Sequence, residues 1–185
     1  MKWFLDTEFL EKPNTIDLIS IALINEKGDE FYYLNKRCNL RAAWKDGWIR
    51  EHVLFSIYKE NIQGDMQNMI PFTYRNIKRI FKNLGSEPKD IASKILWQTT
   101  KNYDTTDENP PEFWGYFSDY DWVVFCWLYG RMINLPQQYP MFCRDLKQLM
   151  EERGYKDPPI KEINNHSALD DARWNKKLYE FLNKK

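Results

Sequence analysis

The sequence predicts an α/β fold in which a mixed sheet is flanked by helices. Two apolar runs near the start are separated by residues 6–15, and a third short run follows a turn at Gly28. Patterns with a helical period prevail later in the chain. Strands first and alternating helices afterwards are typical of a mixed sheet covered by helices. With 185 residues, the chain is most simply one domain.

Three strands are expected at the start of the chain. Residues 2–5 form a short apolar run, and residues 16–24 form a longer one. The turn "NEKGDE" follows, and residues 30–34 ("EFYYL") then pair back as a third strand. Three strands joined in this way form a meander.

Helices and a loop are expected in the middle of the chain. Residues 44–54 are rich in turn and helix signals, and residues 74–84 place their apolar side chains on one helical face before a stop at Gly85. A second helix is expected over residues 89–99. Residues 102–112 are rich in Asn, Asp, Thr and Pro, which predicts a loop.

The C-terminal part is expected to return to the sheet and then to end in a helix. Residues 113–117 have the pattern of a fourth strand, and Ser118 can cap the helix that follows. Residues 142–153 have an amphipathic helical pattern. A connector with room for a short strand at residues 160–163 leads to the final helix, residues 168–183.

Charge, cysteine content and hydropathy narrow the class of protein. Lys plus Arg and Asp plus Glu number 27 each, so total charge gives no general case for nucleic-acid binding, although local patches matter more than totals. Three widely spaced cysteines without a CxxC pair argue against a zinc site and favour free thiols. The longest apolar run, residues 122–129, is far shorter than the ~20 residues of a membrane helix. Asp6 and Glu8 interrupt the N-terminal apolar run, which argues against a signal peptide. We therefore expect a cytoplasmic protein.

Asp6 and Glu8 stand one residue apart where the first strand ends. Residues two apart on a strand face the same side, so the two carboxylates point together if the strand continues that far. Adjacent carboxylates repel, and a divalent cation is their natural partner. A solvated strand end is the alternative, because a lone DxE pair is a weak signal.

A second acidic group lies in "NNHSALDDARW" near the C-terminus. Ser167 and Asp170 have the spacing of a capping box, which makes Ala168 the first helical residue. His166 then lies just outside the helix and can turn towards Asp171, the carboxylate without a capping role. An exposed loop histidine remains the alternative.

A third group, Asp119 and Asp121, lies between the fourth predicted strand and its helix. Ser118 and Asp121 have the spacing of a capping pair, and Asp119 would favour a helix N-terminus. Spacing alone does not choose between these roles and metal binding.

Together, "DTEF", "SDYDWVVF" and "HSALDDA" resemble the three motifs of the DEDDh superfamily of 3′–5′ exonucleases. Within it, the chain is most similar to the small bacterial and phage exoribonucleases typified by RNase AS. The likeness extends to "TIDLISIAL", "WGYFSDYD" and "FCRDLKQLMEERG". The resemblance implies a ribonuclease-H-like fold with a mixed five-stranded sheet, in one exonuclease domain over residues 1–185. Residues 45–110 do not follow the family pattern and look like a helical insertion.

The resemblance also implies site residues. It makes Asp6, Glu8, Asp121 and Asp171 the carboxylates that hold two divalent cations, Mg²⁺ or Mn²⁺, and it makes His166 the general base. It also selects Asp121 over Asp119. Four cations close to the motifs in sequence are candidates to offset the acidic cluster: Lys12, Arg144, Lys147 and Lys161.

The implied reaction is removal of nucleoside monophosphates from the 3′ end of single-stranded RNA, with a hint of adenylate-rich ends. Single strands need stacking surfaces, and Phe9 is the first candidate, followed by Trp114 and Tyr120, with Thr7 as a further substrate contact. For each aromatic, a place in the core is an equal alternative.

Three other functions stay open at this point. They are a DNA-directed 3′–5′ exonuclease of the proofreading type, a non-catalytic RNA-binding module on the same fold, and a metal-dependent phosphohydrolase for small phosphate esters. The resemblance also leaves a homodimer open.

Overall fold

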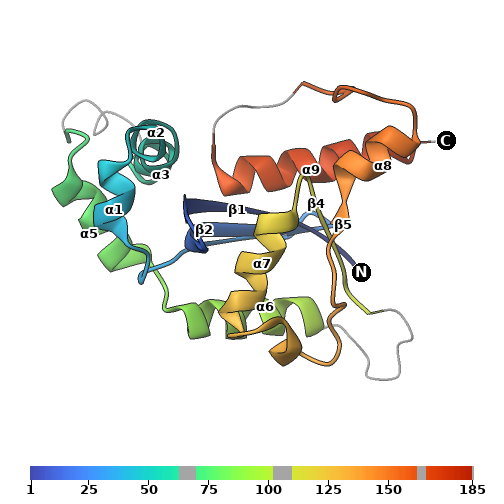
Figure 1. The fold of residues 1–185 in the computed structure, drawn as a ribbon, viewed down its shortest axis with the longest axis horizontal. Coiled ribbons are helices and arrows are strands. Elements are labelled where there is room, and N and C mark those ends of the chain that lie inside the picture. Colours follow the sequence, from blue (N-terminus) through green and yellow to red (C-terminus); the bar gives the residue numbers. More distant parts are fainter. Residues whose placement is uncertain (63–69, 102–109, 162–165, 185) are drawn as a thin grey trace.

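The computed structural model describes residues 1–62, 70–101, 110–161 and 166–184. A five-stranded mixed sheet runs through the middle of the molecule, and helices lie on both sides of it (Figure 1). This arrangement confirms the predicted α/β fold and is consistent with a ribonuclease-H-like fold.

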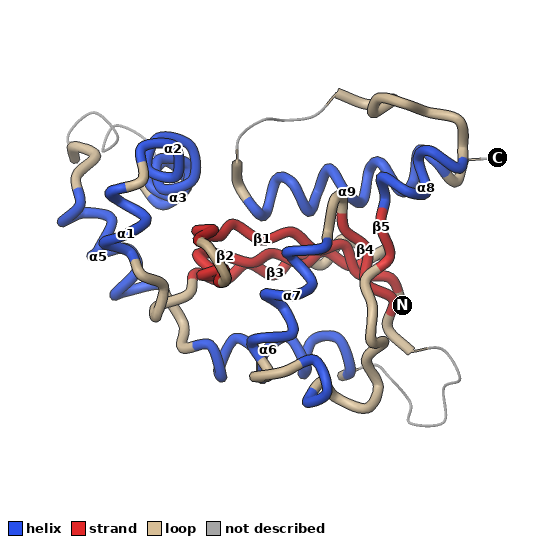
Figure 2. The backbone as a smooth tube through the Cα atoms, in the orientation of Figure 1, coloured by secondary structure: helices blue, strands red, loops and turns tan. Residues whose placement is uncertain are grey.

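The sheet has the strand order β3-β2-β1-β4-β5. Strands β1 (Lys2–Lys12), β2 (Thr15–Asn25) and β3 (Glu30–Leu34) form the predicted antiparallel meander. Strand β4 (Glu112–Gly115) pairs with β1 in parallel, and β5 (Arg144–Asp145) pairs with β4 in parallel. The two edges of the sheet therefore come from opposite parts of the chain (Figure 2).

Strand β1 is longer than the apolar run that predicted it. Pairing with β2 continues to the Lys12–Thr15 pair, with an irregularity between Glu8 and Phe9. The strand keeps its ladder through the acidic residues because β2 supplies backbone partners along its whole length. Asp6 and Glu8 thus lie within a strand, where their spacing places them on one face.

The fifth strand differs from the prediction of a single helix over residues 142–153. Arg144–Asp145 forms β5, and helix α8 (Leu146–Glu152) begins only after it. The Asp145 side chain caps α8 by accepting the amides of Lys147 and Gln148. A two-residue strand is too short to show an alternating pattern. The helical pattern of the neighbouring residues therefore led to the prediction of a helix at these two positions.

Two other predictions fall partly beyond the described residues. Of the strand expected at residues 160–163, residues 160–161 are not in a strand and 162–163 lie outside the description. Of the loop expected at residues 102–112, residues 102–109 lie outside it, and Glu112 begins β4.

The other predicted helices are confirmed within one or two residues. They are α5 (Tyr74–Leu84), α6 (Pro88–Thr100), α7 (Asp119–Leu128) and α9 (Ala168–Leu182). Residues 40–61 add four short helical segments: α1 (Leu40–Lys45), α2 (Gly47–Ile49), η1 (Arg50–Leu54) and α3 (Phe55–Asn61). A 3₁₀ turn, η2 (Met132–Asn134), follows α7.

Ser118 stands at the N-cap of α7, but its side chain does not cap that helix. Its backbone amide instead donates a hydrogen bond to Asp145 Oδ2, 2.9 Å away. This bond joins the start of α7 to the end of β5, which corrects the expected capping role.

The hydrophobic core consists of clusters on the two faces of the sheet and of a further cluster among the helices at one end of the sheet. Helices α8 and α9 cover one face, and α6 and α7 lie on the other (Figure 1). Helices α1, α3 and α5 build a separate cluster with Leu10 of β1, including Leu40 and Phe81. The three cysteines are free thiols, as predicted. None of the helices in the described part of the chain is both long and apolar enough to cross a membrane.

Candidate active site

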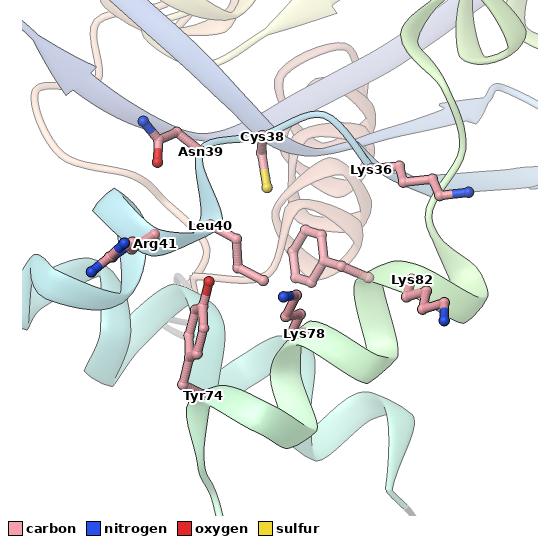
Figure 3. Close-up of a pocket in the computed structure, with 9 residues that line it drawn as sticks. Lys36, Cys38, Asn39, Leu40, Arg41, Tyr74, Lys78 and Lys82 are labelled. Atoms are coloured by element: carbon pink, nitrogen blue, oxygen red, sulfur yellow. The ribbon is translucent and has the colours of Figure 1, made fainter.

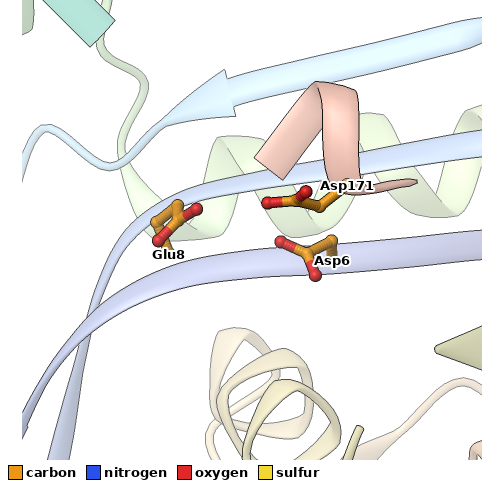
Figure 4. Close-up of side chains that lie close together, drawn as sticks. All are labelled: Asp6, Glu8 and Asp171. Atoms are coloured by element: carbon orange, nitrogen blue, oxygen red, sulfur yellow. The ribbon is translucent and has the colours of Figure 1, made fainter. Parts of the chain in front are cut away.

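Three carboxylates from opposite ends of the chain meet above the sheet. Asp6 and Glu8 project from β1, and Asp171 projects from the first turn of α9 (Figure 4). One oxygen of each lies within 4.8 Å of the others. The structure therefore brings together three of the four predicted metal-binding carboxylates as one group.

The start of α9 places Asp171 over β1. The Ser167 side chain caps the helix by accepting the Asp170 amide, as predicted, and its hydroxyl donates to Glu60 of α3. One turn after Asp171, the side-chain amide of Asn175 donates to the Leu5 carbonyl over 2.9 Å. Asn175 is buried, so this bond locks α9 to β1 next to Asp6.

Replacing Ser167 should destabilise the protein. We expect Ser167→Ala to lower the free energy of unfolding by about 1–2 kcal/mol, because the helix loses its cap and Glu60 loses a donor. Urea unfolding measures the loss. Ser93→Ala, on an exposed position of α6, is the control, and equal effects of the two substitutions would contradict the capping role.

The electrostatics of the group show uncompensated negative charge. Burial, followed by the charges of Asp121, Glu8 and Asp171, raises the pKa of Asp6 well above its ordinary value. Burial and neighbouring carboxylates likewise raise the pKa of Glu8. Within the described part of the chain, no Lys or Arg forms an ion pair with Asp6 or Glu8.

Asp121 is buried beside the group but is not one of the three closest carboxylates. Its Oδ1 accepts hydrogen bonds from the Thr7 amide at 2.9 Å and the Thr7 hydroxyl at 2.5 Å. Burial raises the pKa of Asp121 to about 6, and the bonds from Thr7 oppose that rise. Asp119, the alternative carboxylate, is exposed.

The raised pKa of Asp121 predicts a pH-dependent stability. Its ordinary value is 3.8, and in the fold it is about 6, so between these values the folded protein binds more protons than the unfolded chain. Without metal, stability should therefore fall as pH rises through this window. We expect the free energy of unfolding of Asp121→Asn, measured relative to that of the wild type, to increase by on the order of 2–3 kcal/mol between pH about 4 and about 7. Denaturant unfolding of both proteins across this pH range tests the prediction. A difference in their free energies of unfolding that does not change with pH would contradict it.

His166 lies just before α9, as predicted, with a positive φ of 46°. Its ring lies 4.7 Å from that of Trp48 and 5.4 Å from that of His52, measured between centroids. Trp48 comes from α2 and His52 from η1. Both histidines of the chain therefore lie together beside the start of the helix that carries Asp171.

Sequence reasoning missed the residues that the segment 45–110 brings to this place. Trp48 and His52 flank His166, and the charge of Glu60 adds to the raised pKa of Glu8. No motif marks these positions. The one usable signal was that the chain has only two histidines, of which one had no proposed role.

Comparison with known proteins identifies the class of protein to which this site belongs. A family model described as the 3'-5' exoribonuclease Rv2179c-like domain matches residues 1–182. The chain belongs to this family. Two curated proteins of Mycobacterium tuberculosis are each 33% identical to it over 173 residues, which cover 94% of this chain and 88% of each relative. They are 3'-5' exoribonuclease MT2234.1 of strain CDC 1551 / Oshkosh and 3'-5' exoribonuclease Rv2179c of strain ATCC 25618 / H37Rv.

Membership of the Rv2179c-like family confirms the predicted enzyme class, a 3′–5′ exoribonuclease. The identity covers nearly the whole chain, so the class does not depend on the motifs alone. RNA is thereby favoured over DNA as the substrate class.

In this exoribonuclease domain, the predicted substrate contacts lie in different surroundings. The rings of Phe9 and Tyr120 lie 5.9 Å apart in an edge-on arrangement, and Tyr120 is exposed. Thr7 is buried, and its hydroxyl is bound to Asp121. Trp114 is buried in the core against Tyr179, so it presents no stacking surface, and the core alternative holds for it.

Of the four cations expected near the motifs, two have other partners, one lies at the surface, and Lys12 is half-buried at the end of β1. Arg144 pairs with Glu112, and Lys147 pairs with Glu151. Lys161 is exposed. In the described structure, the acidic partners of Arg144 and Lys147 are thus not members of the carboxylate group.

Proposed function

We propose that this exoribonuclease is a DEDDh enzyme of the RNase AS type that uses two divalent cations, Mg²⁺ or Mn²⁺. It removes nucleoside monophosphates from the 3′ end of single-stranded RNA. The observation that carries the proposal is the convergence of Asp6, Glu8 and Asp171, with oxygens within 4.8 Å of one another. Family membership supplies the reaction class.

The donor set fits hard divalent cations. Carboxylate oxygens are the ligands that Mg²⁺ and Mn²⁺ prefer. Asp6, Glu8 and Asp171 would hold the cations together with Asp121, whose charge is among the causes of the raised pKa of Asp6 and Glu8. When bound, the cations would activate a water molecule and offset the negative charge that develops at the phosphate and the leaving 3′ oxygen.

His166 is proposed as the general base. An imidazole with an ordinary pKa of ~6.5 can take a proton from water near neutral pH. Its position outside α9 frees it from the helical backbone, and Trp48 packs against its ring. Trp48 and His52 would therefore limit the orientations of the imidazole.

Phe9 and Tyr120 are proposed to stack on the terminal bases of the RNA. Phe9 directly follows Glu8 on β1, and Tyr120 directly precedes Asp121 on α7. Base stacking on aromatic rings contributes ~1–3 kcal/mol per base and tolerates any sequence. This placement would hold the last nucleotides beside the carboxylates.

A gel assay tests the proposed function. A 5′-labelled single-stranded RNA should shorten from its 3′ end in Mn²⁺ or Mg²⁺ and should stay intact in EDTA. The DNA of matched sequence should be shortened more slowly. Faster shortening of DNA would keep the chemistry and overturn the substrate, and full activity in EDTA would overturn the metal requirement.

A further inference from the structure

A basic pocket lies in the helical cluster at the end of the sheet, and Asp6, Glu8 and Asp171 are not among the residues that line it. It has a volume of about 410 Å³ and opens between the segment before α1 and helix α5 (Figure 3). Four cations line it: Lys36, Arg41, Lys78 and Lys82. No acidic side chain lines it among the residues that the structure describes.

The positive charge of this pocket is not neutralised by close ion pairs, although the charge of Lys36 helps to lower the pKa of the exposed Glu87 carboxyl nearby. None of the four cations forms an ion pair with any residue in the described ranges. Four like charges around one concavity repel one another and attract an anion. Because the chain has no net charge, this concentration is local rather than a reflection of the whole surface.

The walls of the pocket are suited to more than a bare anion. Its floor is apolar, formed by the buried side chains of Leu40 and Phe81. The Tyr74 ring lies at one side, close to Lys78 (Figure 3). Cations beside apolar and aromatic surface are the combination that binds the phosphate and the base of a nucleotide.

The pocket lies off the end of the strand that carries the carboxylates. The Asn39 amide at its rim donates to Asp17 of β2 over 2.6 Å, and Asp17 pairs with Leu10 of β1. Leu10 also packs in the same cluster as Leu40 and Phe81. Leu10 is two residues beyond Glu8, roughly 7 Å along the strand. A polynucleotide whose 3′ end reaches the carboxylates can therefore extend to this pocket within a few nucleotides.

We propose that this pocket binds a nucleotide of the RNA strand upstream of the 3′ end, with Lys78 and Lys82 contacting its phosphates. The choice of RNA rests on the proposed function, while the pocket itself rests on its own residues. An RNA nucleotide and a free mononucleotide both present a phosphate attached to a nucleoside, so a free mononucleotide is the alternative ligand for this pocket.

Helix α5 provides a matched control. Lys78 and Lys82 are one turn apart and line the pocket, whereas Arg75 and Arg79 are one turn apart, exposed, and do not line it. Lys78→Gln/Lys82→Gln and Arg75→Gln/Arg79→Gln therefore remove equal charge from one helix. Both pairs are made in Asp6→Asn protein in EDTA, which keeps the RNA intact.

The experiment measures fluorescence anisotropy of a labelled single-stranded RNA that spans both sites, and of a labelled trinucleotide, at several salt concentrations. Loss of two phosphate contacts should weaken binding of the long RNA about tenfold and reduce its salt slope by about 1.4. The trinucleotide should bind equally well, and the arginine pair should retain wild-type affinity. AMP, measured by calorimetry on the same proteins, tests the free nucleotide.

Each outcome decides the proposal. A loss confined to the long RNA and the lysine pair supports an upstream RNA site. A loss of AMP binding alone in the lysine pair supports the pocket with a free nucleotide as its source. Equal losses in both pairs, or none, would overturn the pocket. Because binding is measured without hydrolysis, the result can be interpreted even if the proposed catalysis fails. If the enzyme is active but the lysine and arginine pairs bind the RNA equally well, only the inference about the pocket is refuted.

Discussion

Asp6→Asn should abolish RNA shortening while leaving the protein folded. The substitution removes a carboxylate from the centre of the group, where Glu8, Asp121 and Asp171 all contribute to its raised pKa. Loss of several kcal/mol of transition-state stabilisation corresponds to a rate at least about a thousandfold lower. The rate of monophosphate release at saturating Mn²⁺ measures this effect.

Thermal unfolding separates loss of chemistry from loss of structure. Without metal, Asp6→Asn should be at least as stable as the wild type at neutral pH, because a buried charge that is repelled by its neighbours is gone. Mn²⁺ should raise the melting temperature of the wild type, since it binds the folded state, and should have little effect on Asp6→Asn. A shift of equal size in both proteins would place the metal elsewhere.

Asp119→Asn is the matched carboxylate control. Asp119 is exposed and lies two residues before Asp121 on the same helix. We expect its activity to stay within about twofold of the wild type, as for surface substitutions away from a site. A large loss for Asp119→Asn, with Asp121→Asn unaffected, would exchange the proposed roles of the two aspartates.

His166→Gln should lower the maximal rate by about 10²–10⁴-fold, the range typical of a lost general base. The metal-dependent rise in melting temperature should remain, because the carboxylates are intact. In the wild type, the rate should fall as pH decreases, because a protonated imidazole cannot accept the proton of the attacking water. The variant should lose that limb of the pH profile.

His52→Gln is the control for His166, because its ring lies 5.4 Å from that of His166. His52 is exposed on η1 and is proposed to orient the imidazole rather than to accept the proton. The His52→Gln substitution should lower the rate much less than His166→Gln does, and the fall in rate at low pH should remain. If His52→Gln removed the limb and His166→Gln kept it, the base would be His52.

Local signals in the sequence were sufficient for most of the secondary structure. Helix α5 has the bounds that its apolar period and Gly85 predicted, and α9 begins where Ser167 and Asp170 indicated a cap. Strand β3 also has its predicted bounds. These features depend on neighbouring residues along the chain, which a pattern of period two or 3.6 reports directly.

Strand β5 could not be predicted in the same way. Arg144 and Asp145 extend the sheet only because β4 lies beside them, and two residues carry no period. Likewise, the extension of β1 through Asp6 and Glu8 depends on pairing with β2. Long-range hydrogen bonds decided both, and no local pattern contains them.

The sequence by itself determined the types and order of the acidic residues, and through them the enzyme class. Only the tertiary structure decided that Asp6, Glu8 and Asp171 meet, because Asn175 and Ser167 fix α9 over β1. It also buried Trp114, placed Trp48, His52 and Glu60 beside the site, and gathered four cations around one pocket. The physical reason is that chemistry follows from residue type, whereas proximity follows from packing between segments far apart in the chain.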